Sequence, residues 1–334
     1  MLLRYFVVIV SVGGGSVAGD LSYNPMKDFY TQVSVPEELD YNALLGYGNS
    51  VYGSLESDRS NLGKPVASKP SLGKPVKDDY QITSELGTGT FGAVYRAISK
   101  AGGWPVALKM ETRAPPLICL AGHSPKGLMS LEYEYGMMRL MQGVPGFPQL
   151  YGGSFDSIPQ HYVMELLGVD LKSYLGAQPG HVVERTKLVG LAHQMVDRLE
   201  AMHERGIVMY DIHLKNFLIH KEVVYVIDLA IAHKMNDRCP IRDFCTQPAF
   251  GIVSSSSYAT DDVRRLMYLL AFLARGTLPW LWVADSLKPK VKAESKARDV
   301  CAGRAGWLLE AYEYVESLTP GSAVDYGRLK KLIG

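Results

Sequence analysis

Cysteine is scarce in this sequence, at four of 334 residues. The four are Cys119, Cys239, Cys245 and Cys301, with no CxxC pair and no histidine at metal-ligand spacing. This pattern excludes the common zinc-binding motifs and favours buried or free thiols. In an oxidising compartment, Cys239 and Cys245 lie close enough in sequence to form a disulfide.

An excess of charge of either sign is also absent. The 35 basic and 34 acidic residues give a formal net charge of +1, and no basic cluster stands out. Nothing therefore favours nucleic acid or an anionic membrane as the main partner. Hydrophobic residues make up 47% of the chain, which suffices for one large domain or two lobes with buried cores. Binding is expected to depend on a defined site.

Long apolar runs are missing, except for a short one at the N-terminus. There Arg4 precedes the run Tyr5–Val12, and small residues follow up to Ala18. The run is too short to span a bilayer and Gly13–Gly15 interrupt it, so residues 1–18 are predicted to be a secretory signal peptide, cleaved after Ala18. A buried strand or a membrane anchor is the alternative. We expect a secreted or secretory-pathway protein without stable membrane insertion after cleavage, and otherwise a cytoplasmic one.

Residues 19–79 are rich in Gly, Ser, Pro and Tyr and follow neither a strand nor a helix period. The motif "LGKPV" occurs twice, at residues 62–66 and 72–76. One short duplication cannot bury a core, so this segment is predicted to be an extended, low-complexity and disordered extension. A docking motif within it is the alternative.

Regular structure is predicted from Tyr80 onward. Strands are expected in "YQITSELGTGTFGAVYRAI", "WPVALKM" and "QHYVMELLG", and a helix in "SLEYEYGMMRLMQG" ends at Gly143. Further on, a helix that ends at Gly206 is expected in "RTKLVGLAHQMVDRLEAMHERG". Two short strands follow, in "GIVMY" and "VVYVID", and another helix is expected in "DDVRRLMYLLAFLARG". The fold class is therefore α+β, with a small β-rich N-terminal lobe and a larger, mainly helical C-terminal lobe.

The segment "LGTGTFGAVY" places Gly87, Gly89 and Gly92 at GxGxxG spacing, followed by Val94. Glycines let a backbone approach phosphate groups closely. Dinucleotide-binding folds share this motif, but there a helix follows it. Here the glycines lie between two strands, and a strand with "VALK" comes next. This arrangement resembles a protein kinase, which implies that Lys109 holds the α- and β-phosphates of ATP; taken alone, Lys109 would be a solvated lysine at a strand end.

A lysine in this role needs a carboxylate from a helix to fix its position. Glu134 is predicted to be that partner. Glu132 competes for the role, but it lies on a different face of the same helix.

Several segments then resemble the casein kinase 1 family in order and approximate spacing. They are "MMRLMQGVPGFPQLYG", "HYVMELLG", "MELLGVDL", "LAHQMVDRLEAMHERGIV", "NFLI", "YVIDLA", "GTLPW" and "VDYGRLKKLI". The resemblance covers residues 80–334 and implies an N-lobe over 80–164 and a C-lobe over 168–334. It also implies a monomeric transferase that uses ATP and Mg²⁺ to phosphorylate Ser/Thr of protein substrates.

The resemblance carries over to individual site residues. Asp211 falls on the catalytic base, and Asn216 and Asp228 fall on the magnesium ligands. The adenine would contact backbone groups of Glu165 and Leu167, with Met164 behind it. The remaining nucleotide-binding positions are Leu86, Gly87, Gly89, Gly92, Val94 and Ala107.

The sequence also departs from the family pattern. Its "MYD" puts Tyr210 where an arginine would bind a phosphorylated activation loop, so control by that modification is not expected. His213 replaces a lysine two residues after the base, and Lys215 is predicted to supply the missing charge. In "DLA", Leu229 still suits an apolar slot, whereas Ala230 lacks the backbone freedom of glycine.

The segment "CTQPAFGI" resembles the family's GTxxYxSI, which implies that Thr246 hydrogen-bonds the catalytic aspartate. Pro248 stands where an arginine would help to bind a pre-phosphorylated substrate. Asp262 matches an aspartate that braces the catalytic loop, although either it or Asp261 could instead be an ordinary helix N-cap. A pseudokinase that acts as a nucleotide-binding or scaffold module is the alternative function, and a small-molecule kinase is a third.

Overall fold

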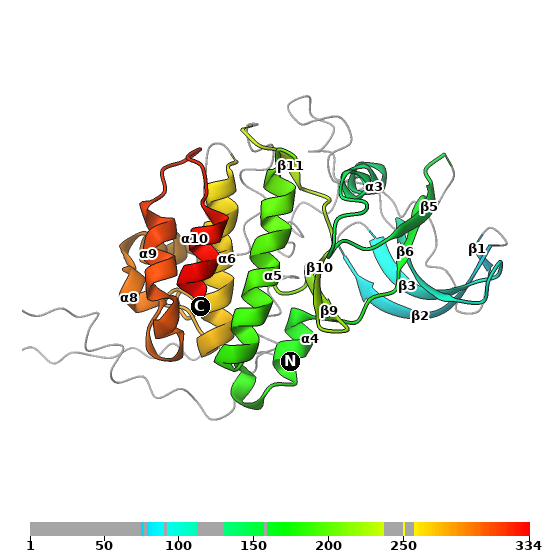
Figure 1. Ribbon diagram of the computed structural model, residues 1–334. Helices are drawn as coiled ribbons and strands as arrows, with labels where there is room; N and C mark the ends of the chain where they lie inside the picture. Colours follow the sequence, from blue (N-terminus) through cyan, green and yellow to red (C-terminus); the bar gives the residue numbers. More distant parts are fainter. Residues whose placement is uncertain are drawn as a thin grey trace, which may run out of the picture. The chain divides into compact units, whose positions relative to one another are not determined.

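The computed structural model describes residues 75–76, 79–89, 92–111, 130–156, 159–236, 250 and 257–334 (Figure 1). All of these belong to one compact unit. The predicted signal peptide, nearly all of the predicted extension, Thr246, Pro248 and three of the four cysteines lie outside the described residues. The predictions made for them, and the domain boundary at residue 80, stay predictions.

The N-terminal lobe is built on a six-stranded antiparallel sheet with the order β1-β2-β3-β4-β6-β5. Its strands are β1 (Pro75–Val76), β2 (Tyr80–Thr88), β3 (Gly92–Ser99), β4 (Pro105–Glu111), β5 (Leu150–Ser154) and β6 (His161–Glu165). The strands expected from the sequence are present. In addition, the last two residues of the second "LGKPV" copy pair with Gln81 and Tyr80 and form β1, upstream of the expected start.

Alternation along the strands gives this sheet two different faces. One face carries a small core of Ile82, Ala93, Tyr95, Ala97, Val106, Leu108, Met110 and Val163. The intervening residues lie on the opposite face, where the register aligns Gly87 with Val94, Val94 with Lys109, and Lys109 with Tyr162. A row across four strands therefore brings the glycine segment and the lysine together.

Helix α3 (Leu131–Leu140) lies beside β5 and β6 (Figure 1). Ser130 caps its N-terminus by accepting a hydrogen bond of 3.1 Å from the Tyr133 amide. The helix ends before Gly143, where the sequence placed its end. The reason is that Met141 and Gln142 already donate to carbonyls three residues back, which tightens the chain into a turn.

The C-terminal lobe is mainly helical, as predicted. Its α-helices are α4 (Leu171–Gly176), α5 (Arg185–His203), α6 (Ala259–Arg275), α7 (Lys288–Glu294), α8 (Ala297–Val300), α9 (Leu309–Ser317) and α10 (Tyr326–Ile333). Short 3₁₀ segments occur at η4 (Pro179–His181), η5 (Asp285–Leu287) and η6 (Gly303–Leu308). Helices α5, α6, α9 and α10 pack side by side (Figure 1). Within the described ranges, no helix has the length and apolar character needed to cross a membrane.

Short strands in the C-terminal lobe flank the loops that contain the predicted site residues. They are β7 (Val169–Asp170), β8 (Ile207–Val208), β9 (Phe217–His220), β10 (Val223–Val226) and β11 (His233–Lys234), and they form the small sheets β10-β9-β7 and β11-β8. The loop between β8 and β9 contains Asp211, and the loop between β10 and β11 contains Asp228. Two pairs of short strands therefore hold both predicted catalytic carboxylates.

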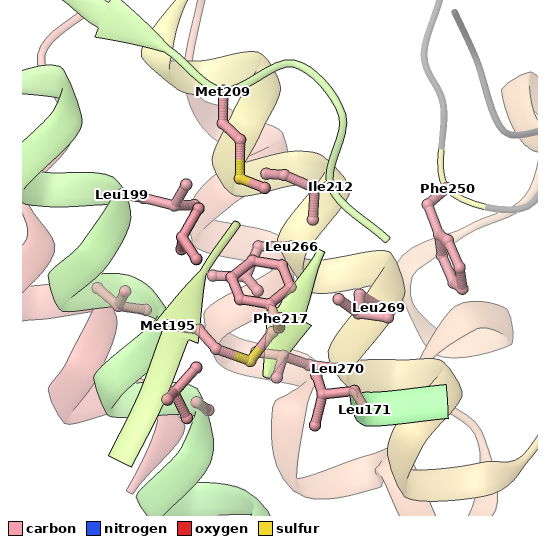
Figure 2. Packing of buried hydrophobic residues seen from close by; sticks show 14 of the residues in the cluster. Leu171, Met195, Leu199, Met209, Ile212, Phe217, Phe250, Leu266, Leu269 and Leu270 are labelled. Atoms are coloured by element: carbon pink, nitrogen blue, oxygen red, sulfur yellow. The ribbon is translucent and has the colours of Figure 1, made fainter. Parts of the chain in front are cut away.

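A large apolar core supports these loops. Figure 2 shows part of it, with Phe217 of β9 among residues of α5 and α6 that include Met195, Leu199, Leu266 and Leu270. Helix α5 has the predicted helical spacing of buried residues, and it ends before Gly206, whose positive φ of 69° suits glycine. Cys301 is also buried, which raises the pKa of its thiol to about 12 and keeps it protonated.

Candidate active site

Lys109 is the residue on which the site is centred. Its Nζ lies 2.7 Å from each carboxylate oxygen of Glu134, which α3 presents towards the sheet. The same Nζ lies 3.4 Å from Oδ2 of Asp228. Glu132 is exposed, so Glu134 is the carboxylate of this helix that reaches the lysine. Strand β4, helix α3 and the loop after β10 are thereby joined at the ammonium group of Lys109.

Burial and pairing act in opposite directions on this group of charges. Burial alone would lower the pKa of Lys109, but the carboxylates of Asp228 and Glu134 outweigh it and raise the pKa, so the lysine stays charged. Burial raises the pKa of Glu134 to about 7, while the charge of Lys109 and a hydrogen bond from Tyr162 prevent a further rise. Glu134 is buried and Lys109 is half-buried, so the ionised state of the pair depends on its neighbours.

Two tyrosines that the sequence analysis did not select hold α3 in this position. The Tyr162 hydroxyl donates to Oε1 of Glu134 at 2.9 Å, and the Tyr133 hydroxyl donates to the Ala232 carbonyl at 2.8 Å. Strand alternation puts Tyr162 on the same face as Lys109 and Met164, and this signal could have identified it. No comparable signal exists for Tyr133, because its partner is 99 residues away.

The glycine segment spans the turn between β2 and β3. The Gly89 amide donates to the Gly92 carbonyl at 2.8 Å. A Cβ on Gly92 would lie 2.1 Å from the Met110 carbonyl oxygen, so packing against β4 requires glycine there. Around Gly87 a Cβ would meet nothing within 4 Å. The fold alone thus does not explain glycine at position 87, whereas close approach of a phosphate group would.

The other predicted nucleotide-binding residues surround this row. Val94 is half-buried and Ala107 is buried opposite Met164, while Leu86 is exposed at the edge. Glu165 ends β6, and its amide donates to the Gln149 carbonyl at 2.8 Å. Its carbonyl oxygen is thus the backbone group of Glu165 available to an adenine. Leu167 is half-buried in the connection that follows β6.

Asp211 lies in the loop between β8 and β9 and receives hydrogen bonds from two side chains. Its Oδ2 lies 3.2 Å from Nε2 of His213 and 3.1 Å from Nδ2 of Asn216. Burial alone would raise the pKa of Asp211, but these two neighbours and the charge of Arg265 lower it below its usual value. Asp211 is therefore ionised at neutral pH and can accept a proton.

His213, rather than Lys215, is the residue in direct contact with Asp211. The Lys215 amide donates to Nδ1 of His213 at 3.1 Å, which leaves Nε2 to donate to Asp211. Burial disfavours the charged ring, but the Asp211 carboxylate overcomes this and raises the pKa of His213. The Lys215 side chain is exposed, and its charge contributes to a lowered pKa of Lys172, after burial.

Asn216 and Asp228 are linked through the backbone, because the Ile227 amide donates to the Asn216 carbonyl at 3.0 Å. Asn216 makes its bonds to Asp211 through Nδ2, which leaves Oδ1 unused by them. Among the described residues, no three or more His, Cys, Asp or Glu form a metal-binding group. One carboxylate and one amide oxygen do fit Mg²⁺, which takes few protein ligands when phosphate supplies the others.

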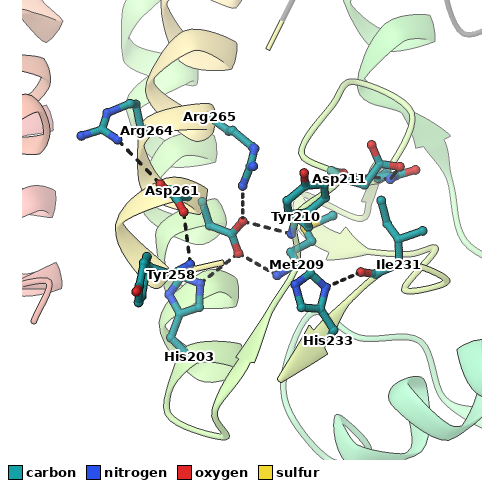
Figure 3. A network of polar contacts seen from close by, with 12 residues as sticks. His203, Met209, Tyr210, Asp211, Ile231, His233, Tyr258, Asp261, Arg264 and Arg265 are labelled. Carbon is teal, nitrogen blue, oxygen red and sulfur yellow. Dashed lines mark hydrogen bonds and ion pairs between the residues drawn. The ribbon is translucent and has the colours of Figure 1, made fainter. Parts of the chain in front are cut away.

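Asp262 braces the catalytic loop from helix α6, and its partners His203, Met209, Tyr210 and Arg265 are labelled in Figure 3. It is fully buried and accepts hydrogen bonds from the amides of Met209 at 2.6 Å and Tyr210 at 3.0 Å, and from Nε2 of His203 at 3.0 Å. Asp261 instead accepts from the Tyr258 amide at 3.2 Å and closes the helix N-terminus. Asp262 therefore has the bracing role, whereas neither aspartate is the N-cap of α6, a position that Tyr258 occupies.

Comparison with known proteins agrees with this geometry. The family described as "Protein kinase domain" matches residues 80–261. Casein kinase I homolog 3 from Schizosaccharomyces pombe is 25% identical over 280 residues, which cover 76% of this chain and 61% of that relative. The matched region thus spans about three-fifths of the relative's length.

Proposed function

Because this chain belongs to the protein kinase family, as a casein kinase 1-like member, we propose that it transfers the γ-phosphate of ATP to Ser or Thr of protein substrates with the help of Mg²⁺. One observation carries the proposal. Lys109 is bonded to Glu134 and also lies within ion-pair distance of Asp228. This joins the phosphate-binding cation to a metal-binding carboxylate, the arrangement that phosphoryl transfer requires.

Each group then has a role that follows from its surroundings. Lys109 would bind the α- and β-phosphates, and Asn216 and Asp228 would hold Mg²⁺, which neutralises charge on the phosphates when bound. Asp211 orients the substrate hydroxyl and accepts its proton, since its lowered pKa keeps the carboxylate ionised. His213 donates a hydrogen bond to Oδ2 of Asp211 and so fixes the orientation of the Asp211 carboxylate.

A pseudokinase that only binds nucleotide or a partner is the alternative. The replacement of the usual loop residues by Met209, Tyr210 and His213, and of glycine by Ala230, motivates it. A kinase for small molecules is a third possibility on the same fold. Retention of Lys109 and Asp211 in paired, half-buried positions favours the active protein kinase.

Assays of the purified full chain with labelled ATP, Mg²⁺ and casein test the proposal. Asp211→Asn is the matched control, since it keeps the shape and removes the base. We expect transfer to casein by the wild-type chain, at least about a hundredfold slower transfer by the variant, and label on Ser or Thr. Nucleotide binding without transfer by either protein would establish the pseudokinase, and label on a small hydroxyl compound alone would establish the third alternative.

We also propose export through the secretory pathway, on the strength of the apolar run before Gly13 and the small residues up to Ala18. N-terminal sequencing of the protein from its native cells should give Gly19 as the first residue. An intact Met1 on a cytoplasmic protein would contradict this.

A further inference from the structure

Tyr210 is the residue before Asp211, and it stands where the family resemblance leads us to expect an arginine. The structure places a guanidinium group at this point all the same. The Cζ of Arg265, from helix α6, lies 4.2 Å from the centre of the Tyr210 ring. Arg265 and Tyr210 are only 1% and 2% exposed. A cation over an aromatic face is attracted by it, and more strongly when both are removed from water.

Arg265 also holds the backbone of the same residue through Asp262. Its NH1 group donates to Oδ1 of Asp262 at 3.2 Å, and this oxygen accepts the Tyr210 amide at 3.0 Å. The ring and the amide of Tyr210 are thus held by one arginine–aspartate pair on α6. Arg265 and Tyr210 lie close together in Figure 3, in agreement with these contacts.

The conformation of Tyr210 makes such support necessary. Its φ is +66°, in the left-handed region that bulky residues rarely adopt. The Asp211 amide donates to the Met209 carbonyl at 2.8 Å across this residue, closing a tight turn. The His233 ring lies 5.5 Å from the Tyr210 ring and belongs to β11, which pairs with β8 just before the turn. The backbone angles of Tyr210 therefore set where Asp211 points.

We propose that Arg265 is a positioning residue for phosphoryl transfer, which clamps Tyr210 from helix α6 and holds Asp211 in place without an arginine in the catalytic loop. The proposal rests on the proposed kinase function. It differs from a packing role because it makes the charge of Arg265, and the aromatic ring of Tyr210, necessary for turnover. The charge of Arg265 also contributes to the lowered pKa of Asp211, in keeping with their proximity.

Arg264 provides a matched control one residue away. Its Nε donates to Glu316 at 2.8 Å and its NH1 lies 3.7 Å from Asp261, on the side of α6 away from the catalytic loop (Figure 3). Both arginines are on the same helix, so replacement of either by methionine removes one charge from α6. Only Arg265 touches Tyr210.

The experiment measures kcat and the KM for ATP with the full chain. Arg265→Met should lower kcat by about ten- to a hundredfold through misplacement of Asp211, with a KM for ATP within about twofold. Arg264→Met should keep kcat within about twofold, because it leaves the clamp intact. Tyr210→Arg should lower kcat by setting two guanidinium groups against each other, and adding Arg265→Met should recover part of the loss.

Three results would overturn the proposal. They are an unchanged kcat in folded Arg265→Met, equal losses in the Arg264 and Arg265 variants, and no recovery in the double variant. Hydrogen exchange at the amides of Met209 and Tyr210 gives a readout that needs no turnover. Protection should fall at least about tenfold in Arg265→Met, and unchanged protection would refute the clamp even if the wild-type chain proved to be a pseudokinase.

Discussion

At the scale of single residues, the surroundings of Asp211 give different roles to His213 and Lys215, the two neighbours that could assist its carboxylate. His213 contacts the carboxylate at 3.2 Å, whereas Lys215 contributes its amide to His213 and keeps its side chain exposed. In the transition state, negative charge spreads over the transferred phosphoryl oxygens, so a nearby cation is worth more there than in the ground state. The histidine therefore positions the carboxylate of Asp211, the proposed base, and Lys215 is the residue expected to supply positive charge.

The first prediction concerns this division. Lys215→Ala should lower kcat by about a hundredfold with a smaller change in the KM for ATP, comparable to the loss of one preorganised donor. His213→Lys should preserve or raise activity, because it supplies a cation beside Asp211. Steady-state kinetics of both variants decide the matter. An unchanged kcat in Lys215→Ala, with an inactive Asp211→Asn, would leave Asp211 as the base without Lys215 as its partner.

The second prediction concerns Tyr162. Its hydroxyl stabilises the ionised form of Glu134, whose pKa burial has already raised to about 7. Tyr162→Phe should raise that pKa further, so more Glu134 is protonated at neutral pH and Lys109 loses its partner. The acid limb of kcat/KM for ATP should then move about one pH unit upward, with activity recovered at alkaline pH.

Tyr135→Phe is the control for Tyr162→Phe. The Tyr135 ring packs 5.6 Å from the Tyr162 ring, but it has no such role at Glu134. Its pH profile should match the wild type. Identical profiles for all three proteins would show that the hydrogen bond to Glu134 does not control the ion pair.

At the scale of elements, the N-terminus of α6 joins two parts of the C-terminal lobe. Asp261 closes the helix itself, while Asp262 ties it to α5 through His203 and to the catalytic loop through two amides. Burial alone would raise the pKa of Asp262, but hydrogen bonds from His203 and Met209 and the charges of His203 and Arg265 lower it. The ionised form is thus favoured by folding.

The third prediction follows from the direction of that change. An aspartate in an unfolded chain titrates near about 3.9, so a lower pKa in the folded protein adds stability above that pH, which is lost as the pH falls through the folded value. Asp262→Asn should cost about 3 kcal/mol of unfolding free energy near neutral pH. Urea unfolding at several pH values should show this difference shrink below about pH 4. A pH-independent difference would contradict the assignment.

Most elements around the site could be predicted from the sequence, since each rests on local patterns. Strand alternation and turn glycines locate β2, β3 and β4, and helical spacing locates α5 and α6. The end of α3 was placed too late, because a turn of three-residue hydrogen bonds stops the helix before the glycine is reached. Similarly, β1 follows from pairing with β2 and not from its own residues.

The contacts that position the site could be predicted only in part. The pairing of Lys109 with Glu134 follows from their motifs, since each occupies a recognisable place on a strand or a helix. The contact of Arg265 with Tyr210 does not, because these two residues meet only through the packing of α6 beside the loop. His213 shows the same limit. The sequence shows that it replaces the family's lysine, whereas its contact with Asp211 depends on ring orientation.

At the scale of the whole molecule, two polar contacts within the described residues join the β-rich lobe to the loop after β10. They are the approach of Lys109 to Asp228 and the hydrogen bond from Tyr133 to Ala232. A nucleotide with Mg²⁺ would add contacts to the same two sides, since Lys109 lies on β4 and Asp228 on that loop. Binding should therefore stabilise the folded chain as a unit.

The fourth prediction is a rise in melting temperature on addition of ATP and Mg²⁺. Nucleotide at about a hundred times its Kd should add about 2.7 kcal/mol, or several degrees. Chelation of the metal should remove most of the effect, and Lys109→Met should reduce it while leaving the fold largely intact. Differential scanning fluorimetry measures all three. A shift that persists in both Asp228→Ala and Lys109→Met would place the nucleotide elsewhere.

The hydrogen bond between Tyr162 and Glu134 also has a consequence for inhibitor design. Tyr162 lies two residues before Met164 on the same face of β6, so a compound extended from the predicted adenine position past Met164 is expected to meet its hydroxyl. Displacement of the phenol would leave Oε1 of Glu134 with Lys109 as its remaining donor, and loss of a hydrogen bond to this charged group costs about 1.5–3 kcal/mol, or roughly ten- to a hundredfold in affinity. A compound with its own hydroxyl or amide donor at that point would recover the loss. Selectivity for this protein over kinases with an apolar side chain there can thus be sought with a single polar group.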